Sequence, residues 1–143
     1  MNSIITIRAS SLGALFDCPA RWAATHIDGL RMPSNAKATL GKAVHASTAV
    51  FDQSTIDGAG ITVDESAAAA VDAITHPDDE VVWGEDSPVD AEKIAISLHA
   101  KYCQQIAPTQ QYTAVEVTCE KLEIADLGIA LSGSTDRIRR VAE

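Results

Sequence analysis

Two residues far apart in the sequence, His45 and Asp136, have the side chains and local settings of metal ligands. His45 completes a Gly-x-x-x-His step that begins at Gly41, and residues four apart lie one turn apart on the same face of a helix. Asp136 follows alternating small and polar residues near the end of a predicted strand. Carboxylate oxygens suit Mg²⁺ and Mn²⁺, and Mn²⁺ also accepts an imidazole nitrogen. The hypothesis is that His45 meets Asp136 at a divalent metal capable of phosphodiester hydrolysis.

The residues around this pair suggest further roles. Gly41 costs a helix about 0.5–1 kcal/mol relative to Ala, and close approach by another backbone or by a ligand is the usual reason for such a glycine. Thr48 and Asp52 share a helical face with Gly41 and His45. Two basic residues after Asp136 are candidate phosphate contacts, with a solvated strand end as the alternative: Arg137 and Arg140.

The apolar pattern predicts helices first and strands afterwards. Helical spacing predicts helices over residues 12–17, 19–28, 36–53, 64–75 and 88–107, with Asn35 and Ser87 as the capping residues of the third and the last. Residues 4–7 alternate and form a short strand or an extended arm. The period changes to two at residues 115–119 and 129–138, which predicts two strands paired as an antiparallel hairpin. The fold class is therefore α+β or α/β, with helices packed on a sheet that this hairpin begins.

Composition limits the classes of function. The 143 residues are 46% hydrophobic, enough for one domain with a core, and contain no apolar run long enough to span a membrane. The N-terminus does not have the pattern of a secretory signal. Cys18, Cys103 and Cys119 are odd in number and widely spaced, so we expect neither a disulfide framework nor an iron–sulfur cluster. A reducing cytoplasm is the expected location.

Charge is distributed unevenly along the chain. The net charge is −9, yet residues 1–42 hold five Arg or Lys against two Asp. Residues 52–92 hold twelve Asp or Glu and no Lys or Arg. This pattern fits a nucleic-acid face beside a solvated acidic flank. It also fits a non-catalytic acidic module that binds a protein partner or mimics DNA.

Three segments, in this order, resemble the RecB-like branch of the PD-(D/E)xK nuclease superfamily. The first segment runs from Ser11-Leu12 through Phe16 and Cys18-Pro19 to Trp22. The second is the Gly-x-x-x-His segment at 40–45. The third is Leu131-Ser132-Gly133-Ser134-Thr135-Asp136-Arg137-Ile138, which is similar to the family's "Gly-x-x-Asp-Arg-Ile" motif. Glu116, on the preceding predicted strand, matches a frequent but less diagnostic glutamate. The resemblance covers residues 10–53 and 112–140.

The resemblance implies a DNA exonuclease or endonuclease of recombination, repair or phage replication, with Mg²⁺ or Mn²⁺ as cofactor. His45 and Asp136 would be metal ligands, Asp136 a catalytic residue, and Glu116 and Gly41 accessory residues. DNA and other recombination or repair proteins are the implied partners, with no membrane involved.

The family pattern also implies an acidic-x-Lys motif after Asp136, and residues 137–143 contain none. We therefore expect residues 1–143 to form a single domain, the N-terminal part of a larger nuclease domain. It would be an incomplete restriction-endonuclease-like core that binds metal weakly. Residues 54–111 match no family segment and are interpreted as a variable helical insert.

Overall fold

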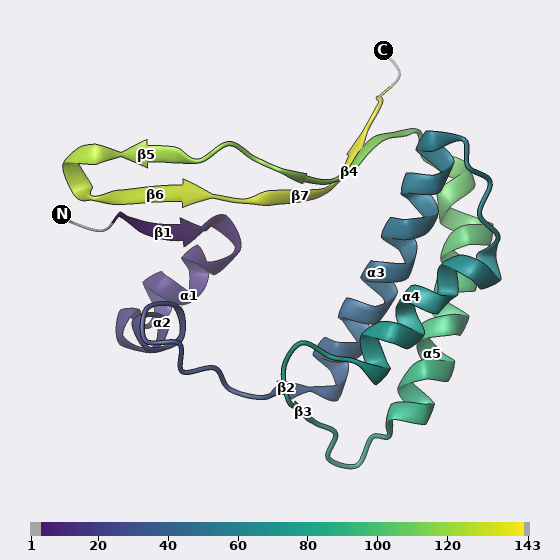
Figure 1. The fold of residues 1–143 in the computed structure, drawn as a ribbon, viewed down its shortest axis with the longest axis horizontal. Helices are drawn as coiled ribbons and strands as arrows, with labels where there is room; N and C mark the ends of the chain where they lie inside the picture. The colour runs from purple at the N-terminus through teal and green to yellow at the C-terminus, as the bar shows by residue number, and fades with distance from the viewer. Residues whose placement is uncertain (1–3, 142–143) are drawn as a thin grey trace. The chain divides into compact units, whose positions relative to one another are not determined.

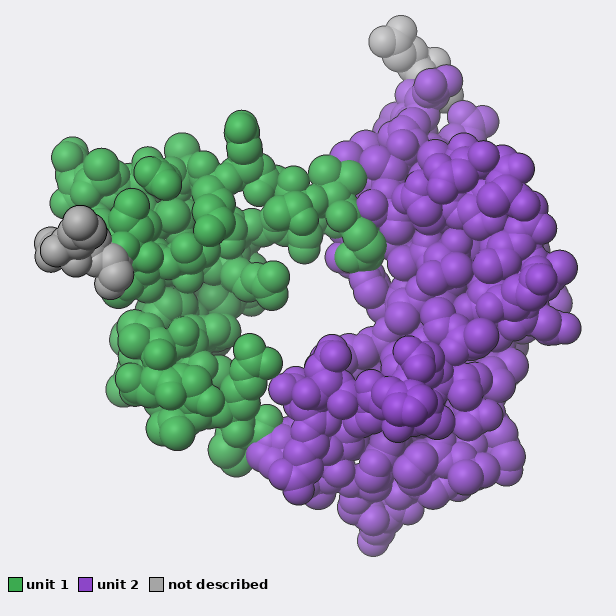
Figure 2. Space-filling view, viewed as in Figure 1, with its two compact units in different colours: residues 1–32, 116–135 green, residues 33–115, 136–143 purple. Residues whose placement is uncertain are grey.

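The computed structural model describes residues 4–141, and their contacts divide the chain into two compact units (Figure 2). Unit 1 contains residues 1–32 and 116–135, and unit 2 contains residues 33–115 and 136–143. The chain passes between the units at the 32/33, 115/116 and 135/136 junctions.

Unit 1 is a small sheet with two short helices. Its elements are β1 (Ile5–Arg8), the 3₁₀ turn η1 (Ala9–Ser11), α1 (Leu12–Asp17), α2 (Pro19–His26), β5 (Leu122–Ile124), the 3₁₀ turn η4 (Ala125–Leu127) and β6 (Ile129–Ser132). β6 lies between β1, to which it is parallel, and β5, to which it is antiparallel (Figure 1). The predicted break before Pro19 is confirmed, because α2 begins with this proline at its first turn. The buried Trp22 donates a hydrogen bond from Nε1 to Ser11 Oγ (3.0 Å).

Unit 2 is built on three helices that pack side by side (Figure 1). Its elements are β2 (Ser34–Asn35), α3 (Ala36–Asp57), α4 (Val63–Thr75), β3 (Val81–Val82), α5 (Pro88–Lys101), the π-helical turn η2 (Tyr102–Ile106) and the 3₁₀ turn η3 (Ala107–Thr109). Asn35 and Ser87 cap α3 and α5 through their side chains, as predicted. α3 extends four residues beyond its predicted end, to a left-handed Gly58.

Two further strands, β4 (Tyr112–Thr118) and β7 (Ser134–Arg139), pair with each other. Within unit 2, Arg140 N–H donates to the Gln111 carbonyl (2.8 Å), and Thr113 Oγ1 donates to the Ile138 carbonyl (3.3 Å). This register is antiparallel, so the predicted hairpin is confirmed, and so is the α+β fold class. The structure adds β5, which the sequence pattern did not reveal, and ends β6 before Gly133.

The core of unit 2 is made mostly of small side chains. Ala43, Ala70 and Ala95 are fully buried, one on each of α3, α4 and α5, and Ile74 packs beside them. Alanines allow helices to approach closely, which suits a chain with few aromatic residues. On α4, Ala67 and Ala70 are buried, whereas Ala68 is exposed.

No helix within residues 4–141 has both the length and the apolar character that a membrane span requires.

Nothing in the sequence marks a partner for His99, yet the structure gives it two on a neighbouring helix. Its side chain is fully buried on α5. The ring nitrogen Nε2 lies 2.8 Å from Ser66 Oγ and 3.2 Å from the Val63 carbonyl, both on α4. Burial lowers the pKa of His99 below its ordinary value. The hydrogen bond to the Val63 carbonyl and the charge of Asp52 act in the opposite direction but do not outweigh burial.

A buried neutral histidine should make stability depend on pH. The unfolded chain takes up a proton at His99 before the folded chain does, so the free energy of unfolding should fall as pH drops below about 6.5. His99→Gln should reduce this loss, although it should also lower stability at neutral pH. Urea unfolding at several pH values measures both effects. The exposed His26→Gln control should keep the parental pH dependence, and an equally steep loss in His99→Gln would contradict the assignment.

Gly41 lies on the exposed side of α3, and a Cβ placed on it would meet nothing within 4 Å. The prediction that another backbone approaches this glycine was therefore wrong for the residues that the structure describes. Gly41→Ala should stabilise α3 by about 0.5–1 kcal/mol, because alanine loses less backbone freedom on folding and meets no clash. Thermal and urea unfolding measure this gain. A loss of stability would reveal a steric constraint at this position.

Candidate metal centre

His45 and Asp136 approach each other within unit 2, as the sequence predicts. His45 Nδ1, on α3, lies 4.0 Å from Asp136 Oδ2, on β7, and the two side chains are 43% and 69% exposed. Two ligands at about 2.1 Å from one ion lie at most about 4.2 Å apart, so this separation fits a shared divalent cation. An imidazole nitrogen and a carboxylate oxygen are also a donor set that Mn²⁺ accepts.

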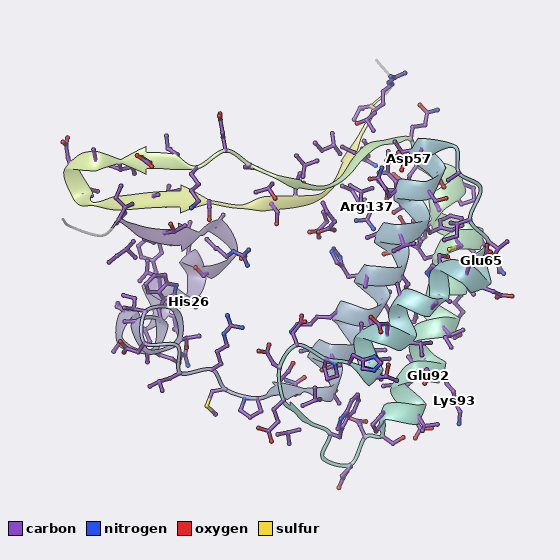
Figure 3. The ribbon with its side chains drawn as sticks, in the orientation of Figure 1. His26, Asp57, Glu65, Glu92, Lys93 and Arg137 are labelled. Carbon is purple, nitrogen blue, oxygen red and sulfur yellow. The ribbon has the colours of Figure 1, made fainter. Side chains whose placement is uncertain are left out.

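The residue after Asp136 holds β7 against the same helix. Arg137 Nε donates to Asp52 Oδ2 (2.7 Å), and Nη2 donates to Thr48 Oγ1 (3.3 Å). The side chains of Asp52 and Arg137 are only 2% and 15% exposed, so this ion pair is buried. Figure 3 labels Arg137 beside α3. Thr48 and Asp52 continue the helical face of His45, so consecutive residues of β7 contact one face of α3.

Two tyrosines complete the surroundings of this ion pair. Tyr102 donates its hydroxyl proton to Asp52 Oδ2 (2.6 Å), and the Tyr112 ring lies 6.0 Å from the guanidinium carbon of Arg137. Burial, followed by the hydrogen bond to Asp52, raises the pKa of Tyr102 well above its ordinary value. Burial alone would lower the pKa of Arg137, but the hydrogen bond and charge of Asp52 outweigh burial and raise it. Arg137 therefore stays charged and Tyr102 stays protonated near neutral pH.

His45 also opens onto a hollow of about 590 Å³ on unit 2, formed by α3, α4 and the segment after α4. Lys42 Nζ lies 3.5 Å from Asp79 Oδ2 at this hollow, and His76 Nδ1 lies 3.0 Å from Asp72 Oδ1. Gly41 lines the same hollow. His45, the candidate metal ligand, therefore borders a hollow that is open to solvent and lined by charged side chains.

The remaining predicted site residues lie as follows. Glu116 is an exposed residue of β4 with a left-handed backbone (φ 52°), a conformation that costs a non-glycine residue about 1–2 kcal/mol. Arg140 is exposed, and its backbone N–H pairs with Gln111. The side chain of Arg137 is held by Asp52 rather than extended into solvent. Phosphate contacts by Arg137 and Arg140 stay predictions.

Sequence reasoning missed the role of Asp52 and Tyr102. A signal for Asp52 was present, because it lies seven residues after His45, two helical turns along the same face. No such signal marked Tyr102, which reaches Asp52 from η2, fifty residues later.

The chain belongs to the PD-(D/E)XK nuclease superfamily, whose sequence profile matches residues 6–143. No curated protein and no solved structure matches the chain significantly. The superfamily membership assigns a nuclease-type function with DNA as the substrate class, and such nucleases use divalent metals. His45 and Asp136 both lie within the matched residues.

Breaking the buried ion pair should destabilise unit 2. Asp52→Asn leaves the Arg137 charge buried without its counter-charge, a change that typically costs about 3–5 kcal/mol. We expect urea unfolding followed by circular dichroism to show a loss of about 3 kcal/mol. Asp57→Asn, at the exposed end of the same helix, is the matched control and should change stability by less than about 0.5 kcal/mol. Equal effects of the two substitutions would contradict a stabilising role for the pair.

Proposed function

We propose that His45 and Asp136 are two ligands of a divalent-metal centre, for Mg²⁺ or Mn²⁺, in a DNA nuclease of the RecB-like branch. The observation that carries the proposal is the 4.0 Å approach of His45 Nδ1 to Asp136 Oδ2, beside an ion pair that fixes the next residue of β7. When bound, such an ion activates water and stabilises the leaving oxygen of a phosphodiester.

The protein's own residues prepare this site in two ways. The imidazole of His45 offers a nitrogen ligand, and Asp136 offers a carboxylate oxygen for a hard cation. Arg137 could neutralise the adjacent Asp136 carboxylate, but its Nε is bound to Asp52 and its Nη1 to the backbone carbonyl of Asp136. Asp52 therefore keeps the guanidinium occupied and favours a free Asp136 carboxylate.

Glu116 is included in the proposal as an accessory acid, as the family resemblance implies. Its left-handed backbone supports the assignment, because strained non-glycine residues cluster at functional sites. The acidic-x-Lys pair that the family pattern implies does not occur in residues 137–143. We propose that residues 54–111 form a helical insert between the two ligands. We further propose a role in recombination, repair or phage replication in the cytoplasm, alongside proteins of the same process.

Metal binding tests the proposal directly. Mn²⁺ binding, followed by electron paramagnetic resonance of the free ion, should weaken by at least about tenfold in His45→Ala and in Asp136→Asn, since each removes one of the proposed ligands. His26→Ala and Asp126→Asn, at exposed positions of unit 1, are the matched controls and should bind as the parent does.

Parental Mn²⁺ binding in both ligand variants, with circular dichroism showing intact folds, would rule out this metal centre. The acidic partner-binding module would then be the better explanation of the chain.

A further inference from the structure

Unit 1 contains a hollow of about 420 Å³ that the proposed metal centre does not use. It lies at the ends of β1 and β6, and its lining is entirely from unit 1: Thr6, Arg8, His26, Thr118, Cys119, Lys121, Ser132, Gly133 and Ser134. In the parallel pair, Arg8 is opposite Ser132, the last residue of β6. Ligands of open sheets commonly bind at the carboxyl ends of parallel strands.

The charge of this hollow is opposite to that of the chain. Arg8, Lys121 and His26 contribute to the lining, whereas no aspartate or glutamate does, in a chain with 20 acidic and 11 basic residues. Figure 3 labels His26 on α2. Within residues 4–141, neither Arg8 nor Lys121 forms an ion pair, whereas Arg21 of the same unit is bound to Asp17 (2.6 Å). The two cations are therefore available to an anionic ligand.

The uncharged lining also offers hydrogen-bond donors. Four hydroxyl groups, those of Thr6, Thr118, Ser132 and Ser134, line the hollow, and none of them forms a side-chain hydrogen bond within the described part of the chain. Gly133 also lines the hollow, where it adds no side chain. No large apolar side chain lines the hollow.

We infer that this hollow binds phosphate groups of a DNA strand. Phosphate oxygens are acceptors only, and they match a lining of cationic and hydroxyl donors without carboxylates. DNA as the polymer rests on the proposed nuclease function. Arg8 and Lys121 supply the charge that displaces counterions from the backbone, and the hydroxyls supply uncharged hydrogen bonds to the phosphates. Binding through this hollow is independent of base sequence.

The test is the salt dependence of DNA binding, measured by fluorescence anisotropy in EDTA with a labelled single strand and the corresponding duplex. Arg8→Gln and Lys121→Gln should each reduce the slope of log K against log salt by about 0.7 for the single strand and about 0.9 for the duplex. For the duplex, that slope corresponds to about eightfold weaker binding at about 0.1 M salt. The double variant should show the sum of the two slope changes.

Two cations outside the hollow serve as controls. Arg21→Gln removes a charge of unit 1 already paired with Asp17, and Lys93→Gln removes one on α5. Both should keep the parental slope, and circular dichroism should show that Arg8→Gln and Lys121→Gln are folded. An unchanged slope in Arg8→Gln and Lys121→Gln, or no DNA binding by the parent, would overturn the inference.

Two further measurements distinguish the phosphate hollow from the proposed metal centre and from a site for small phosphates. The DNA measurement is made in EDTA and the Mn²⁺ titration is made without DNA, so failure of the metal centre and failure of the phosphate hollow give different results. Calorimetry with inorganic phosphate identifies a site for small phosphates. If Arg8→Gln and Lys121→Gln lose phosphate binding but keep the DNA slope, the hollow takes a small ligand and the DNA inference is wrong.

Discussion

The buried ion pair between Asp52 and Arg137 is the constraint on which the candidate metal centre depends. The two residues are 85 positions apart, and their contact joins the C-terminal half of α3 to β7. Removing both charges from water carries a large desolvation cost, which is offset only where geometry and additional hydrogen bonds are favourable. Here Tyr102 adds a second donor to Asp52, and Thr48 accepts from Arg137. Because Asp136 precedes Arg137, fixing Arg137 also limits where the Asp136 carboxylate lies relative to His45.

An apolar contact between α3 and β7 would constrain this arrangement less. A shift of β7 by one position would place Asp136 or Ile138, rather than Arg137, opposite Asp52. An apolar side chain tolerates such a shift when another apolar residue replaces it, whereas a buried carboxylate left without its partner does not. The ion pair thus favours a single register of β7 on α3. The same contact keeps the guanidinium away from the Asp136 side chain, so one interaction positions the proposed metal ligand and keeps Arg137 from pairing with it.

The sequence predicted the parts of the fold that local chemistry determines. Asn35 and Ser87 cap their helices as expected, and the face shared by His45, Thr48 and Asp52 is the one that meets β7. Strand β5 was missed because three residues give too little alternation to be distinguished from a loop. The burial of His99 was missed because it depends on Ser66, 33 residues away. The sequence thus predicted the features that local propensity determines and missed those that depend on contacts between distant segments.

The same distinction applies to charge. Counting residues gives an acidic chain, and on that ground alone binding to DNA would be unexpected. The contacts divide the cations into groups with different roles: Arg137 is buried with Asp52, whereas Arg21 and Lys42 are paired with acidic neighbours at the surface. Arg8 and Lys121 line a hollow without carboxylates. Attraction to a phosphate backbone depends on the local field at such a place, because at physiological ionic strength charges farther away than about 8 Å are largely screened. The net charge of the chain therefore does not by itself exclude DNA from a hollow whose lining holds cations and no carboxylate.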